Sequence, residues 1–128
     1  MRKLNLSDVF KMGRIIKAAN IKTALVNIFK NVDEKDAGIS EDDSEEMKEQ
    51  KLGKLRESVG LEAVMTVFEA CCTEQLENMI YDFLGGVTEK ETEKIATQYL
   101  GTTIEDIKTI VKENNVADFF KDAGRLIQ

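Results

Sequence analysis

Apolar residues recur at intervals of three and four along almost the whole chain. Residues three and four apart share one face of an α-helix, whereas a half-buried strand needs strict alternation, which no segment shows convincingly. The 128 residues include no proline, so no position imposes a helix break. The pattern therefore predicts an all-α protein, a single compact domain of about seven short amphipathic helices.

Capping residues and glycines give the expected helix boundaries. Asn5 or Ser7 can cap a first helix that stops at Asn20, and a second short helix follows to about Lys30. Gly13 inside the first helix indicates a close helix crossing. Further expected boundaries are breaks at Gly60, Gly85–Gly86 and Gly101, a cap at Thr73, a stop at Asn114–Asn115, and capping boxes at Ser40–Asp43, Thr88–Glu91 and Thr103–Asp106.

The same spacing predicts which side chains face the core. The predicted core faces include Leu6 and Phe10 in the first helix, Leu61, Val64, Met65, Phe68 and Cys72 in a central helix, and Ile95, Tyr99 and Leu100 in a later one.

Charged residues are distributed unevenly along the chain. Residues 1–32 carry seven Lys or Arg against one acid, whereas residues 33–50 carry nine acids against two lysines. The helical pattern also stops between 31 and 40, which predicts a mobile acidic connector there. We expect one helical domain over 1–128, made of an N-terminal helix pair (1–30), the connector (31–40) and a main helical bundle (41–128).

The amino-acid composition excludes the sites of most common enzyme classes. Histidine is absent, which excludes His-dependent triads and the common zinc sites with His ligands. The loop that begins at Asp33 lacks the oxygen ligands and final Glu of a calcium loop, and no glycine-rich phosphate loop is present. We expect no enzyme activity, no metal and no cofactor.

The overall charge and the cysteines narrow the expected partners further. A net charge of −6 opposes non-specific nucleic-acid binding, although Lys11, Arg14 and Lys17 lie on one positive helix. No apolar run is long enough for a membrane span. A disulfide between the adjacent Cys71 and Cys72 would restrain almost no chain, so both thiols are expected to be reduced. One of them is expected to be buried as a small hydrophobic residue.

Two terminal segments resemble a known protein family. The opening stretch Leu4–Lys17 (LNLSDVFKMGRIIK) is similar to the start of tail assembly chaperones from long-tailed phages and prophages that infect Gram-positive bacteria. The closing Asn115–Lys121 (NVADFFK), preceded by Leu84–Thr88 (LGGVT) and a pair of short helices, is similar to the family's terminal Asp-Phe-Phe element. The middle of the chain fits by hydrophobic pattern alone.

The resemblance implies a chaperone that binds and solubilises the phage tape measure protein and assists recruitment of tail tube subunits during tail assembly. It also implies a location in the host bacterial cytoplasm, absence from the mature virion, and commonly a longer partner made by programmed frameshifting. The N-terminus agrees with that location, because Met1-Arg2-Lys3 runs into a polar segment unlike a secretory signal. The family has no fixed set of functional residues, so none is carried over.

The candidate contact surface therefore comes from the residues alone. A chaperone for a long helical client needs an apolar stripe to offer to an amphipathic helix. The stripe Val116, Phe119, Phe120, Ala123 and Ile127 can close the domain core, form a homo-oligomer contact or hold the client, and Arg14 and Lys17 can meet an acidic client. A different interpretation of the chain is a small acidic helical interaction module that regulates or inhibits a host protein.

Overall fold

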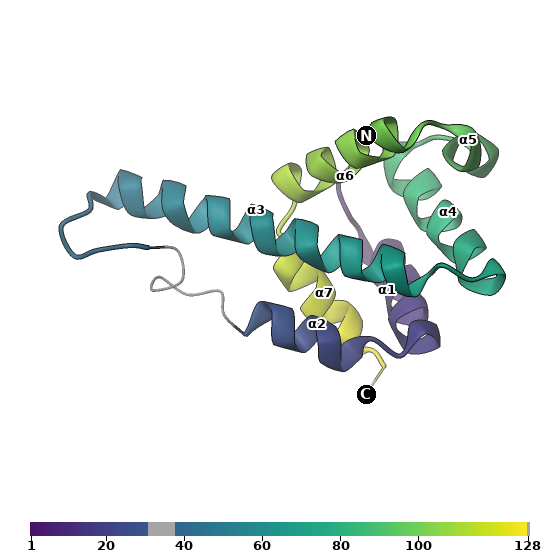
Figure 1. Cartoon of the computed structure of the whole chain (residues 1–128), viewed down its shortest axis with the longest axis horizontal. Coiled ribbons are helices and arrows are strands. Elements are labelled where there is room, and N and C mark those ends of the chain that lie inside the picture. The colour runs from purple at the N-terminus through teal and green to yellow at the C-terminus, as the bar shows by residue number, and fades with distance from the viewer. Residues whose placement is uncertain (31–37, 128) are drawn as a thin grey trace.

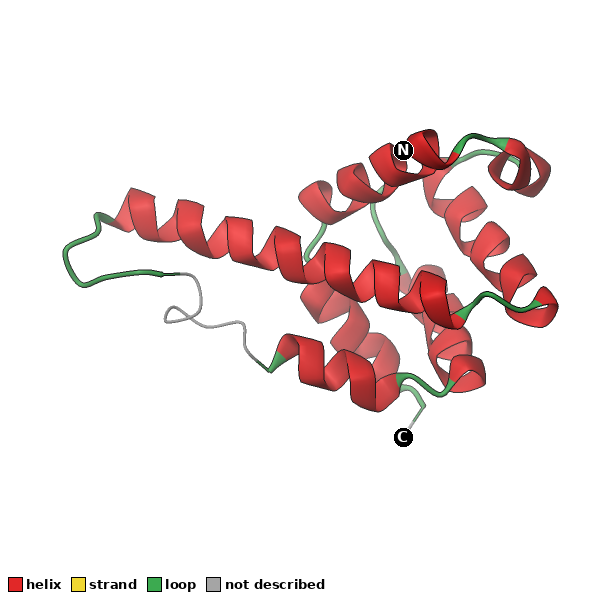
Figure 2. Ribbon diagram, in the orientation of Figure 1, coloured by secondary structure: helices red, strands yellow, loops and turns green. Residues whose placement is uncertain are grey.

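The computed structural model describes residues 1–30 and 38–127, and every regular element within them is a helix (Figures 1 and 2). In chain order the helices are α1 (Leu6–Ala19), α2 (Lys22–Phe29), α3 (Glu45–Ala70), α4 (Glu74–Thr88), α5 (Thr92–Thr97), α6 (Leu100–Glu113) and α7 (Val116–Arg125). The all-α prediction is confirmed for this part of the chain. The predicted mobile connector at 31–40 lies mostly outside the described residues, which resume at Gly38.

Several predicted helix caps are confirmed. The Asn5 side chain accepts a hydrogen bond from the Asp8 backbone N–H, and the Asp8 carboxylate accepts one from the Asn5 N–H, which together form a capping box. Asn20 ends α1 with a left-handed φ of 56°, as expected of a helix stop. Thr73 caps α4. The predicted stop at Asn114–Asn115 is also confirmed, because α6 ends at Glu113 with Asn114 as its C-cap, and Asn115 in addition caps α7. These caps depend on contacts within a few residues, which the local sequence specifies.

The predicted helix breaks at glycines are wrong. Gly60 lies inside α3, a continuous helix of 26 residues. A Cβ atom at this glycine would lie 3.2 Å from Val111 Cγ1. Gly85 and Gly86 lie inside α4, which continues to Thr88 and ends at Glu89 with a φ of 60°. These glycines allow other parts of the chain to approach a helix closely, and they do not end it.

The predicted capping boxes after α2 are also wrong. Thr88 is the last residue of α4, and its buried hydroxyl donates to the Leu84 carbonyl at 2.6 Å. α6 begins at Leu100, so Thr103 lies within the helix and is buried. Gly101 lies in the first turn of α6. The Ser40 N–H does donate to the Asp43 carboxylate at 2.9 Å, but α3 begins after Ser44, which supplies the cap.

One hydrophobic core joins all seven helices of the described residues. Its buried members are Met12, Ile15, Ile16, Leu25, Ala63, Val67, Cys71, Leu76, Ile80, Phe83, Leu84, Val87, Ile95, Ile107, Ile110, Val111, Val116, Phe119, Phe120 and Ala123. Outside α3 and its C-terminal end, four residues predicted to face the core are instead exposed, with exposed fractions of 66% for Leu6, 46% for Phe10, 87% for Tyr99 and 69% for Leu100.

α3 turns a different face to the core than predicted. Its buried positions are Val59, Gly60, Ala63 and Val67, followed by Cys71 at the helix end. Of the larger residues predicted there, Leu61, Val64 and Phe68 are half-buried, whereas Met65 and Cys72 are exposed. Small side chains at the centre of the face allow α3 to approach the neighbouring helices closely, and the larger ones pack at the sides.

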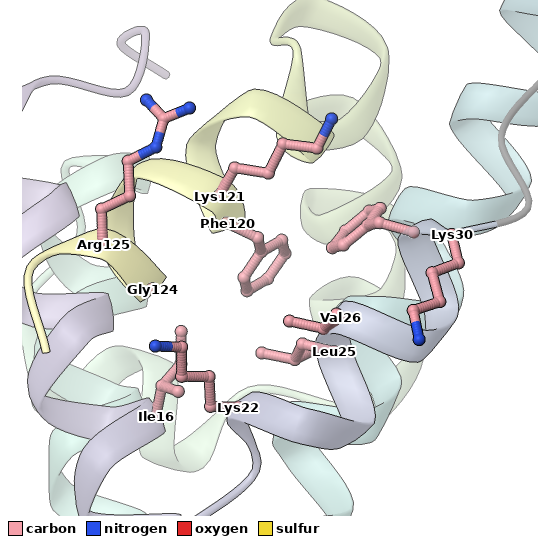
Figure 3. A pocket seen from close by; sticks show the side chains of 10 residues that line it. Ile16, Lys22, Leu25, Val26, Lys30, Phe120, Lys121, Gly124 and Arg125 are labelled. Carbon is pink, nitrogen blue, oxygen red and sulfur yellow. The ribbon is translucent and has the colours of Figure 1, made fainter. Parts of the chain in front are cut away.

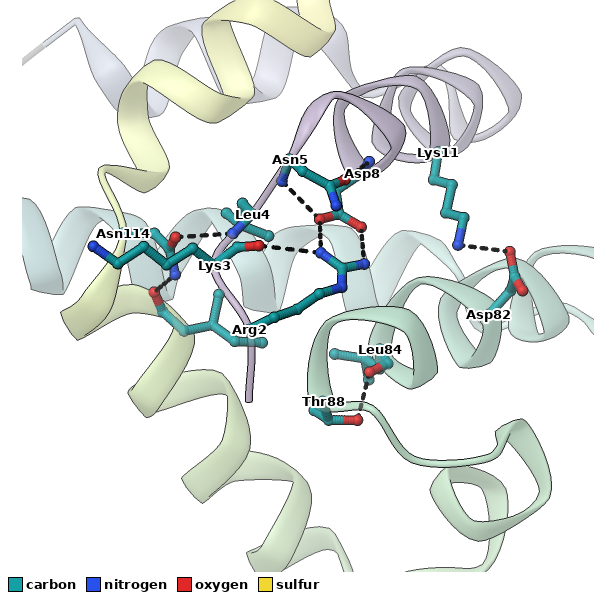
Figure 4. A network of polar contacts seen from close by, with 11 residues as sticks. Arg2, Lys3, Leu4, Asn5, Asp8, Lys11, Asp82, Leu84, Thr88 and Asn114 are labelled. Atoms are coloured by element: carbon teal, nitrogen blue, oxygen red, sulfur yellow. Dashed lines mark hydrogen bonds and ion pairs between the residues drawn. The ribbon is translucent and has the colours of Figure 1, made fainter.

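The first five residues tie α1 to two other helices (Figure 4). The Arg2 backbone N–H donates to the Val87 carbonyl of α4 at 3.2 Å, and the Leu4 N–H donates to Asn114 Oδ1 at the end of α6 at 3.1 Å. The Arg2 guanidinium donates to both carboxylate oxygens of Asp8, at 2.6 and 2.9 Å. These bonds fix the start of α1, the helix against which α7 packs.

α1 and α7 cross closely at Gly13, as predicted from the position of that glycine. A Cβ atom at Gly13 would lie 3.4 Å from the Ala123 carbonyl oxygen and 3.6 Å from Ile127 Cγ2. This close crossing holds α1 and α7 side by side, and α2 also packs against α7.

Candidate functional site

An open groove with a volume of about 360 Å³ lies between α2 and α7 (Figure 3). Leu25 and Val26 of α2 point toward Phe120 of α7 across it. We call this feature the α2–α7 groove. Its lining is Ile16, Lys22, Leu25, Val26, Phe29, Lys30, Phe120, Lys121, Gly124 and Arg125.

Aliphatic and aromatic side chains form the floor of the α2–α7 groove. The Phe29 and Phe120 rings lie 5.8 Å apart between centroids, tilted by 32°, which is a favourable aromatic geometry. Leu25 and Ile16 are buried beneath, whereas Val26 is 47% exposed. An exposed valine beside an aromatic pair provides apolar surface that a binding partner can cover.

The rim of the groove is positively charged. Lys22 and Lys30 come from α2 and its C-terminal cap, and Lys121 and Arg125 come from α7. Arg125 pairs with Asp122 at 3.4 Å, and both side chains are exposed. None of the ion pairs among the described residues involves the three lysines of the rim. This rim therefore favours a ligand that carries negative charge beside an apolar surface.

Local sequence explains how the two helices form this groove. The left-handed turn at Asn20 lets the Ile21 N–H donate to the Ile16 carbonyl, so α2 begins directly after α1. Asn115 caps α7. The close crossing at Gly13 sets the distance between α7 and α1. The groove is consequently made from the first thirty and the last dozen residues of the chain.

The residues predicted as a contact surface divide into three groups. Val116, Phe119 and Ala123 are buried in the core, as the core interpretation of the stripe predicts, and Ile127 is half-buried against it. Phe120 is also buried, yet it lines the α2–α7 groove. The exposed Arg14 and Lys17 lie outside the lining of the groove.

Sequence reasoning missed the cations of the rim and Val26. A signal was present at Val26, because this apolar residue lies beside the predicted core face of α2 and not on it. The cations gave no comparable signal, because nearly a hundred residues separate the two pairs in the chain.

The described residues also bear on thiol chemistry, metal binding and membrane spans. Burial is the main cause that raises the pKa of Cys71, and the neighbouring Cys72 adds to it, so the Cys71 thiol is not activated as a nucleophile. No group of three or more metal-ligating side chains occurs within residues 1–30 and 38–127. No helix in these same ranges is both long and apolar enough to cross a bilayer.

No protein-family model, no curated protein and no solved structure matches this chain.

Proposed function

We propose that this protein is a tail assembly chaperone that binds the phage tape measure protein and keeps it soluble while tail tube subunits are recruited. The observation that carries the proposal is the α2–α7 groove, an apolar surface with a basic rim on a small helical domain. Such a surface fits an amphipathic client helix with acidic residues beside its apolar face.

The positions of the two resembling segments support this proposal. The opening segment forms most of α1, and the closing Asp-Phe-Phe segment forms the first half of α7. These helices cross at Gly13, and Phe120 of the closing segment lines the groove. The opening and closing segments therefore pack against each other, and they contribute Ile16, Phe120 and Lys121 to the lining of a groove whose other wall is α2.

The size of the groove limits how much client one copy covers. α2 has 8 residues and α7 has 10, so at 1.5 Å per residue these walls span roughly 12 to 15 Å. This length covers two to three turns of a client helix, by the same geometry. A long client therefore needs several chaperone copies, and the net charge of −6 on each copy keeps the loaded complex soluble.

Co-expression tests the proposal. The chain is produced together with the tape measure protein encoded beside it, and the soluble client that copurifies is measured. We expect the wild type to raise the soluble client several-fold, and Val26→Asp to lose this effect because the charge falls in the apolar groove.

Leu100→Asp is the matched control for this experiment, since Leu100 is 69% exposed on α6 and lies outside the groove lining. Circular dichroism first checks that both variants remain folded. Client that stays insoluble with the wild-type chain, although its own expression is confirmed, contradicts the proposal. Equal rescue by Val26→Asp and the control contradicts the choice of groove.

The acidic tip of α3 favours a second candidate, a small interaction module that regulates or inhibits a host protein. Exposed acids gather before and within the first turns of this helix, at Glu41, Asp42, Glu45, Glu46 and Glu49. Such a surface fits the basic site of a nucleic-acid-binding protein. Tight binding to a purified host protein of that kind, without client rescue, would favour this second function.

A further inference from the structure

The two helices that form the walls of the α2–α7 groove run antiparallel. α2 starts at Lys22, which Figure 3 shows on the side of the groove where Gly124 of α7 lies. Phe29, at the other end of α2, packs against Phe120, which comes four residues before Gly124 in α7. The start of α2 therefore lies beside the end of α7, and the end of α2 lies beside the middle of α7.

This arrangement puts cations at both ends of the groove. Lys22 and Arg125 lie at one end. Lys30 and Lys121 each directly follow one of the two paired phenylalanines, so they lie together at the other end. Lys22 is the first residue of α2 and Lys30 is its C-terminal cap, so the ends are about 12 Å apart along the helix. Asp122 pairs with Arg125 at 3.4 Å and partly neutralises it, so Lys22 carries most of the charge at its end.

Between its charged ends the groove is apolar. Leu25 and Val26 point toward Phe120 across it, and no acidic side chain among the described residues contributes to the lining. A volume of about 360 Å³ is at the lower end of the range for ligand pockets, so the groove accepts side chains while a client backbone stays above the rim. The lining therefore suits a short apolar contact with an acid at each end.

One helical pattern matches these dimensions. Positions i, i+3, i+4 and i+7 share one face of an α-helix, and the first and last of them are about 10.5 Å apart along the axis. This separation is close to the length of the groove between its two charged ends. Apolar side chains at i+3 and i+4 then lie over Val26 and Phe120, and acids at i and i+7 reach the cations at either end.

We propose that the α2–α7 groove recognises a client helix by two acidic residues seven apart that flank two apolar residues, in the order acid-x-x-apolar-apolar-x-x-acid. This inference rests on the proposed function, since it specifies the client segment that the same groove binds. The spacing is the same in both chain directions, so a client helix satisfies it in either orientation between the antiparallel walls.

Charge supplies the selectivity of this recognition. The net charge of −6 repels an acidic client from most of the protein surface, whereas the cations at the groove ends attract it locally. Exposed ion pairs are individually weak and are screened by salt. The apolar contact therefore supplies most of the affinity, and the two acids decide which helices bind and in which register.

Synthetic peptides test the motif directly. The probe is an alanine-based helical peptide with two glutamates seven residues apart and two leucines at the third and fourth positions between them, labelled with fluorescein. The matched peptide has both glutamates moved two residues along, onto the opposite face, with the same composition and net charge. Fluorescence anisotropy measures binding to the purified full-length chain, after circular dichroism has shown that the peptides are equally helical. We expect the first peptide to bind about five-fold more tightly at low ionic strength, and the difference to shrink as salt is added.

Charge reversal in the protein tests the two ends of the groove. Lys22→Glu with Lys121→Glu should remove the preference, and a peptide with lysines in place of its glutamates should then bind this variant more tightly than it binds the wild type. The control is Lys94→Glu with Lys112→Glu, which makes the same change in net charge at exposed positions outside the groove lining. It should keep the preference, and circular dichroism checks that both variants remain folded.

Equal binding of the two peptides to the wild-type chain, or binding of neither, overturns the inference. So does a preference that the groove reversal leaves as large as the control reversal does. The co-expression experiment decides the proposed function separately. Client rescue with equal peptide binding upholds the function and rejects the motif, whereas the predicted peptide preference without client rescue upholds the motif and contradicts the function.

Discussion

Asp8 has no exposed surface, and among the described residues it is the only charged side chain so placed. Its carboxylate accepts hydrogen bonds from Nη1 and Nη2 of Arg2 and from the Asn5 backbone N–H. Burial by itself raises the pKa of a carboxyl group, but the bonds from Arg2 and Asn5 outweigh it and hold the pKa of Asp8 below its ordinary value of 3.8. The charged form of Asp8 therefore stabilises the fold.

Asp8→Asn should lower the free energy of unfolding by about 2 kcal/mol at pH 7, because the charged hydrogen bonds to Arg2 are lost. Since the folded pKa is lowered, this contribution is present above the unfolded pKa and disappears as the pH falls through the folded one. Urea titrations at pH 7 and pH 3 should show the wild type and the variant converging in acid. A difference that is the same at both pH values would contradict this account.

Two glycines inside helices should respond in opposite ways to alanine. A Cβ at Gly85 would lie 2.9 Å from the Lys90 carbonyl oxygen, a backbone atom that cannot move freely. We expect Gly85→Ala to destabilise the protein by about 1 to 3 kcal/mol. Gly53→Ala meets no neighbour and should stabilise it by about 0.5 to 1 kcal/mol. Thermal unfolding of both variants at low protein concentration checks the prediction, and a gain for Gly85→Ala would contradict it.

α7 shows how one apolar stripe supplies both core and groove. Phe119 lies 5.9 Å from Phe83 of α4 and 5.6 Å from Phe120, between ring centroids. Phe120 lies in turn against Phe29 of α2. These aromatic contacts connect α4, α7 and α2, so the position of the groove depends on the core beneath it.

Phe119→Asp should unfold the protein. Removing a buried phenylalanine costs about 3 to 5 kcal/mol, and burying a carboxylate adds to this, against a total stability of about 5 to 15 kcal/mol for a typical domain. Far-ultraviolet circular dichroism should show the loss of helix, whereas Tyr99→Asp, at a position that is 87% exposed, should retain it. A helical, cooperative Phe119→Asp variant that has lost only partner binding would show that the residue is not core.

The two halves of α3 should differ in stability in the monomer. Residues 45–58 contain no buried side chain, whereas the second half belongs to the core. Hydrogen exchange followed by mass spectrometry on a dilute sample should show low protection in the first half and high protection from Val59 to Ala70. Uniform protection along α3 in a proven monomer would contradict this expectation.

Helix class and many helix ends were predictable from the sequence because they depend on neighbours in the chain. Apolar spacing predicted the all-α fold, and Asn5, Asn20 and Thr73 act where they were expected to. Each of these features is satisfied by hydrogen bonds or side-chain contacts within one or two turns, which local sequence specifies.

Contacts between residues far apart in the chain determine the features that the sequence did not predict, namely the roles of the glycines, the buried face of α3 and the α2–α7 groove. The roles of Gly60 and Gly86 depend on distant parts of the chain that approach them, Val111 and Val116 at Gly60 and Arg2 and Lys11 at Gly86. The face of α3 that turns inward is likewise the one that meets other helices. The α2–α7 groove brings Lys22 and Lys30 beside Lys121 and Arg125. No local pattern encodes such a juxtaposition, because nearly a hundred residues separate the two pairs and only the packing of the whole core sets where they meet.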